Sequence, residues 1–165
     1  KRRIELDINK VDKDHYDHFL NGAIFEVYDN TAKSHVTTLA SGQLMIVGND
    51  VNEEYEISKD EDFTKIIKTV KTDENKQIIL GIDDGTYYSR KVGDNKVSKH
   101  VIKDGKAVLV DAIYGHEYEF KEIKAPTSYQ LADKSKAYKV EADKDTDTII
   151  YYFENARIVV PNTGV

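Results

Sequence analysis

Apolar and polar residues alternate along many short stretches of the chain, and this alternation predicts β-strands. In residues 4–11, Ile4, Leu6 and Ile8 share one parity and lead into Lys10, while the polar run 12–17 ends the stretch. Successive side chains of a strand point to opposite faces, so each such stretch has one face suited to a core. Further strands are expected at 23–28, 43–47, 54–57, 78–82, 86–91, 97–102, 106–113, within 118–129, at 137–141 and at 148–155.

One segment follows a different period. Apolar residues recur there at i, i+3, i+4 and i+7, namely Phe63, Ile66, Ile67 and Val70. Ser58 and Glu61 form a possible capping box just ahead of them. This spacing predicts one short helix over residues 60–72 that packs on the sheets. A helix that binds a partner through the same face is the alternative.

Turn residues separate the expected strands. Gly85 and Gly105 each close a short polar link, which predicts two hairpins, one across 83–85 and one across 104–105. About ten strands with a single helix predict an all-β sandwich rather than alternating βαβ units. We expect one domain over 1–157, with 33–103 as an elaboration inside it and 158–165 as a separate C-terminal segment.

The composition excludes several classes of function. The chain has 165 residues, enough to bury a substantial core, and a formal net charge of -6 with scattered basic residues. An acidic chain without a basic stripe does not favour nucleic acid as a partner. Cysteine is absent, so neither disulfides nor thiolate metal sites are available. No apolar run is long enough to span a membrane, and Lys1-Arg2-Arg3 does not open a signal peptide.

Three expected strands carry a polar residue on the face that the pattern predicts to be buried. On the first strand this residue is Lys10, which continues the parity of the apolar side chains before it. Glu122 follows two aromatic residues, Tyr118 and Phe120, and Asn155 ends the face of the last strand. Burial of each polar group alone would cost several kcal/mol. We therefore expect the three side chains to lie together.

A lysine, a carboxylic acid and an amide in an apolar site can react with one another. Burial lowers the pKa of the lysine and raises that of the acid, which makes a neutral amine beside a protonated acid accessible. The amine of Lys10 can then attack the carboxamide carbon of Asn155 while Glu122 acts as the acid that moves protons. Ammonia leaves and an amide bond remains. This self-directed reaction needs no cofactor and no metal, and it turns over once.

The residues around these three resemble the Cna B-type (SpaA-like) domains of Gram-positive pilins and adhesins. Four stretches carry the resemblance: INKVD at 8–12, LNGAIFEVY at 20–28, YEFKEIKAPTSY at 118–129 and FEN at 153–155. Ser128 stands where glycine is usual. The resemblance implies a prealbumin-like (inverse immunoglobulin) sandwich and an isopeptide bond between Lys10 and Asn155, with Glu122 as its acid. Residues 33–103 take almost no part in it.

The C-terminal residues resemble a second motif. Val160-Pro161-Asn162-Thr163-Gly164 is similar to the LPxTG-type signal that sortases read, with valine in place of leucine. The resemblance implies cleavage between Thr163 and Gly164 and transfer of the Thr163 carboxyl to a pilin lysine or to peptidoglycan. The apolar helix and basic tail that follow such signals are expected beyond the present C-terminus.

Together these features predict a structural pilus subunit at the extracellular surface, cell-wall-anchored or in a pilus, and not an enzyme. Its expected partners are sortase, neighbouring pilin subunits or peptidoglycan, and a possible host ligand. The alternative is a singly anchored adhesin that binds a ligand through 33–103. No Tyr-Pro-Lys-Asn pilin motif is present, so backbone, basal and tip subunits stay open.

Each site residue also has a simpler interpretation. Lys10 could extend to solvent while Lys13 takes its place, and Glu122 could form a surface pair with a neighbouring lysine. His15 and His18 have a spacing that metal sites use, but solvated loop histidines are the more common case. The acidic run 143–147 resembles a calcium loop, although Thr148 stands where that loop requires glycine.

Overall fold

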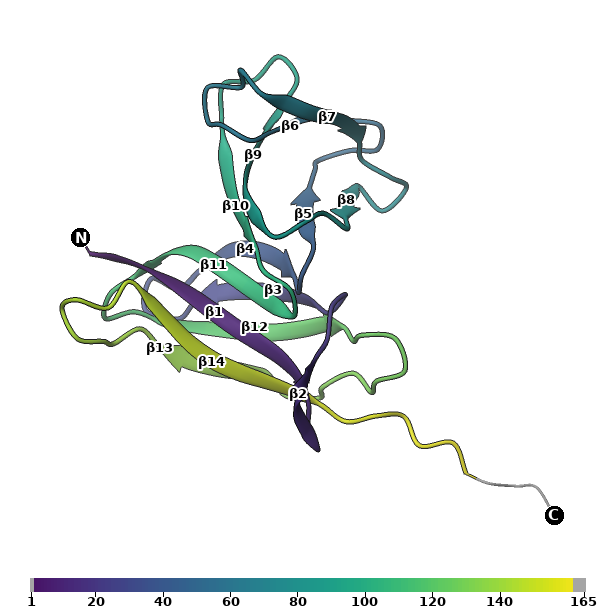
Figure 1. Cartoon of the computed structure of the whole chain (residues 1–165), viewed down its shortest axis with the longest axis vertical. Coiled ribbons are helices and arrows are strands. Elements are labelled where there is room, and N and C mark those ends of the chain that lie inside the picture. The colour runs from purple at the N-terminus through teal and green to yellow at the C-terminus, as the bar shows by residue number, and fades with distance from the viewer. Residues whose placement is uncertain (1, 162–165) are drawn as a thin grey trace.

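Two four-stranded sheets form a β-sandwich in the computed structural model, which describes residues 2–161 (Figure 1). One sheet has the order β11-β1-β14, with β2 paired to β1, and the other has the order β13-β12-β3-β4. The expected all-β sandwich is confirmed. The sandwich strands are β1 (Arg3–Asp12), β2 (His15–Phe19), β3 (Ile24–Asp29), β4 (Ser34–Ala40), β11 (Lys106–Ile113), β12 (Glu117–Lys124), β13 (Lys136–Lys139) and β14 (Thr148–Asn155).

The first and last strands of the chain are neighbours. β1 is the central strand, antiparallel to β11 and parallel to β14. In the parallel register Lys10 lies opposite Phe153 and Asp12 lies opposite Asn155. Parallel neighbours need a long connection between them, and here nearly the whole chain forms that connection. This topology places the first and last strands side by side, with the C-terminal ends of both strands at the same end of the sandwich.

The sandwich core is built from the faces that the alternation predicted. Ile4, Leu6 and Ile8 share this core with Phe153 of the neighbouring β14 and with Phe25 and Phe120 of the opposite sheet. The ring of Phe25 meets those of Phe120 and Phe153 edge to face. The outer face of β1 was expected to be exposed, but Asp7, Asn9 and Val11 are also buried. Lys103 bonds Asp7, and Lys106 donates to Asn9 Oδ1, so two lysine side chains cover that face.

The remaining strands form a separate lobe, which we define as residues 44–102. It contains the sheet β10-β9-β6-β7 and the pair β5-β8, and it has its own hydrophobic cluster around Ile57 and Tyr87 (Figure 1). The single domain 1–157 with an elaboration at 33–103 stays a prediction. The lobe strands are β5 (Leu44–Val47), β6 (Glu54–Ser58), β7 (Ile66–Lys71), β8 (Gln77–Leu80), β9 (Gly85–Lys91) and β10 (Ser98–Ile102).

The helix predicted at residues 60–72 is wrong: within residues 2–161 the structure contains strands and turns but no helix. Asp60 accepts hydrogen bonds from the backbone N–H groups of Thr64 and Lys65, and Phe63 has a φ of 55°, so 59–65 forms a tight loop. Residues 66–71 then form β7, paired to β6. Their β-branched side chains favour a strand, and Ile66 and Ile67 are exposed rather than packed in a helical stripe.

The two predicted hairpins are also wrong, although their strands exist. β8 pairs with β5, and β9 pairs with β6 and β10, so the link at 83–85 joins different sheets. The link at 104–105 likewise leads from β10 in the lobe to β11 in the sandwich. Within the polar run 12–17, residues from His15 onwards start β2 instead of a loop. Local turn signals located these strand ends but not the strands' partners.

A partly buried histidine, His100, makes the lobe sensitive to acid. Burial lowers the pKa of His100 from 6.5 to about 4, and its Nε2 lies 2.7 Å from Ser89 Oγ. The unfolded chain therefore binds a proton that the folded lobe excludes, and stability present above pH 6.5 is lost as the pH falls towards 4. Between pH 7 and pH 5 we expect a loss of roughly 1–2 kcal/mol from this residue.

Urea unfolding of the wild type and of His100→Gln at both pH values measures this effect. Glutamine does not titrate in this range, so the variant should show the smaller pH dependence. His18→Gln, at an exposed position on β2, is the control and should behave like the wild type. An equal pH dependence in wild type and His100→Gln would contradict the assignment.

Candidate functional site: a buried lysine, glutamate and asparagine

Lys10, Glu122 and Asn155 are brought together inside the sandwich, as the parities predicted. They lie near the ends of β1, β12 and β14, and their exposed fractions are 0%, 4% and 2%. Lys13, the competing lysine, is exposed, and its backbone N–H donates to Asn155 O. The strand register therefore selects Lys10 as the buried amine.

Asn155 is held through its side-chain nitrogen. Nδ2 donates to Glu122 Oε1 at 2.7 Å and to the backbone oxygen of Gln130 at 2.7 Å. A carbonyl oxygen only accepts hydrogen bonds, so the atom facing Gln130 must be the nitrogen, and this fixes the orientation of the amide. Asn155 Oδ1 is buried without a hydrogen-bond partner.

Glu122 is held through one oxygen and leaves the other without a partner. Oε1 accepts from Asn155 Nδ2 and, at 3.0 Å, from the backbone N–H of Ala132, while Oε2 is buried and unpaired. Burial raises the pKa of Glu122 against the opposing effect of these hydrogen bonds and of nearby Lys10. This shift makes the protonated acid more accessible, and a proton on this acid would lie on Oε2, because Oε1 already accepts two hydrogen bonds.

Lys10 lies in an environment that makes its neutral form more accessible. Burial lowers its pKa to about 8, with the charge of Glu122 opposing that shift. Its Nζ donates to the backbone oxygen of Phe153 at 3.0 Å and to that of Val11 at 3.4 Å. A neutral amine has two N–H groups and one lone pair, so two carbonyl acceptors leave the lone pair free.

A second lysine beside carboxylates provides a contrast. Lys103 Nζ lies 2.7 Å from Glu5 Oε2 and 2.9 Å from Asp7 Oδ2. Partial burial lowers the pKa of Lys103, but the hydrogen bonds to both acids outweigh it and the pKa is raised. Lys103 thus stays cationic as part of an ion pair, whereas Lys10 is shifted towards the nucleophilic amine.

Backbone groups in the segment that follows β12 complete the site, and the sequence pattern did not identify them. We refer to residues 126–132 as the strap. It supplies Gln130 O to Asn155 and Ala132 N to Glu122. No side-chain pattern identifies a carbonyl or an amide as a contact group, so only the path of the strap could show this.

Ser128, the residue that departs from the family pattern, has a φ of 72° within the strap. A side chain in this left-handed region costs roughly 1–2 kcal/mol, part of which a glycine regains in the unfolded state. Ser128→Gly should therefore raise the free energy of unfolding by up to about 1 kcal/mol, measured by urea unfolding. Ser135→Gly, without a positive φ, is the control; a destabilised Ser128→Gly would refute the strain.

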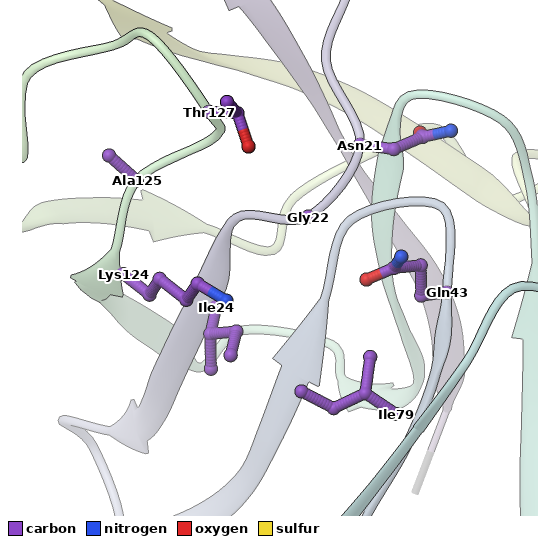
Figure 2. A pocket seen from close by; sticks show the side chains of 8 residues that line it. All are labelled: Asn21, Gly22, Ile24, Gln43, Ile79, Lys124, Ala125 and Thr127. Carbon is purple, nitrogen blue, oxygen red and sulfur yellow. The ribbon is translucent and has the colours of Figure 1, made fainter.

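Two of the surface cavities lie beside β12, the strand that carries Glu122. One of about 510 Å³ opens beside Glu122 and is bordered by residues from 119–122 and 131–135. The other, of about 390 Å³, lies where the sandwich meets the lobe, between the start of β3, the end of β12 and residues of β8 and of the turn before β5 (Figure 2). Lys124 is the one ionisable side chain among its lining residues, so this second cavity offers no acid and base pair.

The residues of the predicted sorting motif lie partly outside the described region. Val160 and Pro161 are exposed on the segment that leads away from β14 (Figure 1). Asn162, Thr163 and Gly164 lie outside the described residues. Across residues 2–161, no helix has the length and apolar character needed to cross a membrane.

Comparisons with known proteins agree with this fold. Residues 90–157 match the family model of SpaA, a prealbumin-like fold domain. No curated protein sequence matches the chain. The match begins at the end of β9 and therefore covers the sandwich strands β11 to β14, including Glu122 and Asn155, whereas Lys10 lies outside it.

Several solved structures of pilins are similar to the chain at low identity. A minor pilin of Streptococcus agalactiae has 21% identity and a TM-score of 0.39, and the match covers 99% of this chain and 48% of that one. The pilus 2b backbone protein of group B streptococcus has 17% identity and a TM-score of 0.37, and the match covers 94% of this chain and 42% of that one. Domains D2 and D3 of the major pilin SpaD of Corynebacterium diphtheriae have 16% identity and a TM-score of 0.37, and the match covers 94% of this chain and 47% of that one. The chain thus spans less than half the length of these three structures.

Proposed function

We propose that the chain, of which residues 90–157 match the SpaA prealbumin-like family model, is a structural subunit domain of a sortase-assembled Gram-positive pilus, locked by an isopeptide bond between Lys10 and Asn155. The observation that carries this proposal is the buried cluster itself. A lysine with a lowered pKa and a glutamate with a raised pKa meet an asparagine on the last strand. A cluster with these opposed shifts and unpaired oxygens is poorly suited to stability alone.

The reaction joins the Nζ of Lys10 to the Cγ of Asn155. The lone pair of the neutral amine attacks Cγ, the bond between Cγ and Nδ2 breaks, and the nitrogen leaves as ammonia. Glu122 receives a proton from Nζ and delivers one to Nδ2, the atom that already donates a hydrogen bond to its Oε1. Every proton is accounted for, since one amine and one carboxamide give one secondary amide and one ammonia.

The unpaired oxygens support the same assignment. A proton on Glu122 Oε2 gives that oxygen a hydrogen to donate, and Asn155 Oδ1 is the buried acceptor that lacks one. As Nζ attacks, negative charge develops on Oδ1, and a nearby acid stabilises it most strongly in a site without water.

The position of the bond has a mechanical consequence. β1 enters the sandwich at Arg3, and Lys10 lies near its far end, where it meets the end of β14. A pulling force that enters along β1 passes across the amide at Lys10 and leaves through Asn155. Residues 11–154 are then bypassed, so the fold stays intact under a load that would otherwise separate its strands.

Assembly by sortase fits the C-terminal segment. Val160 and Pro161 lie on an exposed stretch that extends beyond the sandwich, so an enzyme can reach them (Figure 1). In our proposal sortase cleaves after Thr163 and transfers its carboxyl to a lysine of a neighbouring subunit or to peptidoglycan. The protein would then be extracellular, at the cell wall or in the pilus shaft.

Extracts of the cell wall test this assembly directly. Antibodies against the domain should detect a ladder of bands that survives boiling in detergent, because the subunits are joined covalently. A Thr163→Ala chain should give only the monomer, and Thr146→Ala, a threonine outside the motif, should leave the ladder intact. A single band in the wild type, shifted by one anchoring event, would contradict polymerisation.

The adhesin alternative is not favoured. A binding surface on 33–103 would require a long apolar groove or a rim of exposed aromatic residues. The exposed large hydrophobic residues described there are aliphatic, such as Val47 and Ile67, and no aromatic residue of that range is among them. The cavity that the lobe shares with the sandwich has a largely polar lining that includes Asn21, Gln43 and Thr127.

A further inference from the structure

The strap contacts both partners of Lys10 through its backbone. Gln130 O accepts from Asn155 Nδ2 at 2.7 Å, and Ala132 N donates to Glu122 Oε1 at 3.0 Å. These two bonds set the orientation of the carboxamide and of the carboxyl at the same time. A shift of the strap would therefore move the leaving nitrogen and the acid together.

Tyr129 attaches the strap to the first strand. Its hydroxyl donates to Asp12 Oδ2 at 2.6 Å, and Asp12 Oδ1 accepts from the backbone N–H of Asp14 at 2.8 Å. Asp12 is buried, lies two residues after Lys10 and faces Asn155 in the strand register. The bond from Tyr129 thus connects the strap to the very part of β1 that carries the nucleophile.

The residues that follow β14 attach the other side of the strap. Ile158 N donates to Ser128 O at 2.9 Å, and Gln130 N donates to Ala156 O at 2.8 Å. Tyr129 and Arg157 form the antiparallel bridge between these bonds. The strap is thereby fixed to β1 and to the continuation of β14, the two strands that the isopeptide bond would join.

We infer that the strap is a positioning element for the reaction and that Tyr129, through Asp12, is its positioning residue. This inference rests on the proposed function. Tyr129 touches neither the amine nor the carboxamide; it holds the strap so that Gln130 and Ala132 align Asn155 and Glu122 with Lys10. A small displacement of reacting groups can slow a reaction by up to about a hundredfold, so loss of this attachment acts on the rate of bond formation.

Timed synthesis of the full chain measures that rate. The protein is made in a cell-free system, samples are quenched in denaturant at intervals, and the fraction that has lost one ammonia is read from the intact mass. Tyr129→Phe keeps the ring and removes the hydroxyl, and it should slow the loss at least about tenfold. Tyr138→Phe removes a hydroxyl of the same sandwich that bonds Tyr152 O at 2.8 Å, and its rate should equal that of the wild type.

Changes at Asp12 separate positioning from a general loss of stability. Asp12→Ala should slow the reaction as much as Tyr129→Phe, and the double variant should be no slower, because both changes break the same contact. Asp12→Asn keeps an oxygen acceptor and should restore most of the rate. The thermal midpoints of Tyr129→Phe and Tyr138→Phe, both measured on the cross-linked protein, should fall by similar amounts. Only Tyr129→Phe should slow the formation of the bond.

The outcomes distinguish this inference from the proposed function. If the wild type never loses ammonia, the isopeptide bond itself is absent and the proposed function loses its chemistry. If the wild type reacts and Tyr129→Phe reacts at the same rate, the bond stands and the positioning role of Tyr129 is overturned. Additive effects of Tyr129→Phe and Asp12→Ala would also overturn it.

Discussion

Replacing Glu122 by glutamine should leave the chain at its full, unreacted mass and lower its thermal midpoint by roughly 10–20 °C. Glutamine fills the same space and can still accept from Ala132 and Asn155, but it cannot carry the proton that the reaction moves. The bond between Lys10 and Asn155 closes a loop of almost the whole chain. By analogy with a disulfide that closes a loop of this size, its loss costs about 5 kcal/mol.

Glu119→Gln is the matched control, because Glu119 lies on the same strand with its side chain on the opposite face. That variant should lose one ammonia as the wild type does and melt within a few degrees of it. Intact mass and thermal unfolding followed by circular dichroism give both readings. A Glu122→Gln chain that still loses ammonia would show that this residue is not the acid.

Lys10→Ala should be the most destabilising single change in the chain. It removes the nucleophile, so about 5 kcal/mol of cross-link stabilisation is lost, and truncation of this fully buried side chain leaves a cavity that costs about 2–4 kcal/mol more. Lys10→Met removes the amine but keeps most of the volume, so it should lose the bond with little of the cavity cost. The difference between the two variants in urea unfolding separates the two contributions.

Lys13→Ala tests the register in the same experiment. Lys13 is exposed and contributes only its backbone N–H to Asn155. Its truncation should leave the mass of the cross-linked chain lower by one ammonia and the stability nearly unchanged. If Lys13→Ala abolished the ammonia loss and Lys10→Ala did not, the pairing of β1 with β14 would be shifted from the one described.

The buried cluster was predictable because it depends on the two-residue period of strands. Lys10, Glu122 and Asn155 each follow, at two-residue spacing, the apolar residues of one strand face. This spacing assigns a side chain to a face without knowledge of the neighbouring strands. The adjacency of β1 and β14 was not in the pattern; it came from the resemblance and from the argument that buried polar groups need partners. The contacts of Gln130 and Ala132 could not be predicted, because every residue carries the same backbone groups.

The lobe was the part that sequence patterns described worst. The spacing of Phe63, Ile66, Ile67 and Val70 fits a helical stripe, but Phe63 is buried in the loop ahead of β7 and the other three residues lie on β7, an edge strand. The loop ahead of β7 is decided by the hydrogen bonds of Asp60 and by the positive φ of Phe63, which the apolar pattern does not encode. The partners of β8 and β9 depend on contacts distant in sequence, and short turns such as 83–85 do not determine these.

The intact mass of the wild-type chain under denaturing conditions tests the account most directly. Unfolding removes every non-covalent contact, so a mass below the value that the sequence gives reports a covalent change, and the Lys10→Ala variant shows whether that change needs Lys10. We predict that the mass of the wild type is lower by one ammonia. The Lys10→Ala variant should have the full mass of its own sequence. A wild-type mass equal to that of the unmodified sequence would contradict the isopeptide bond.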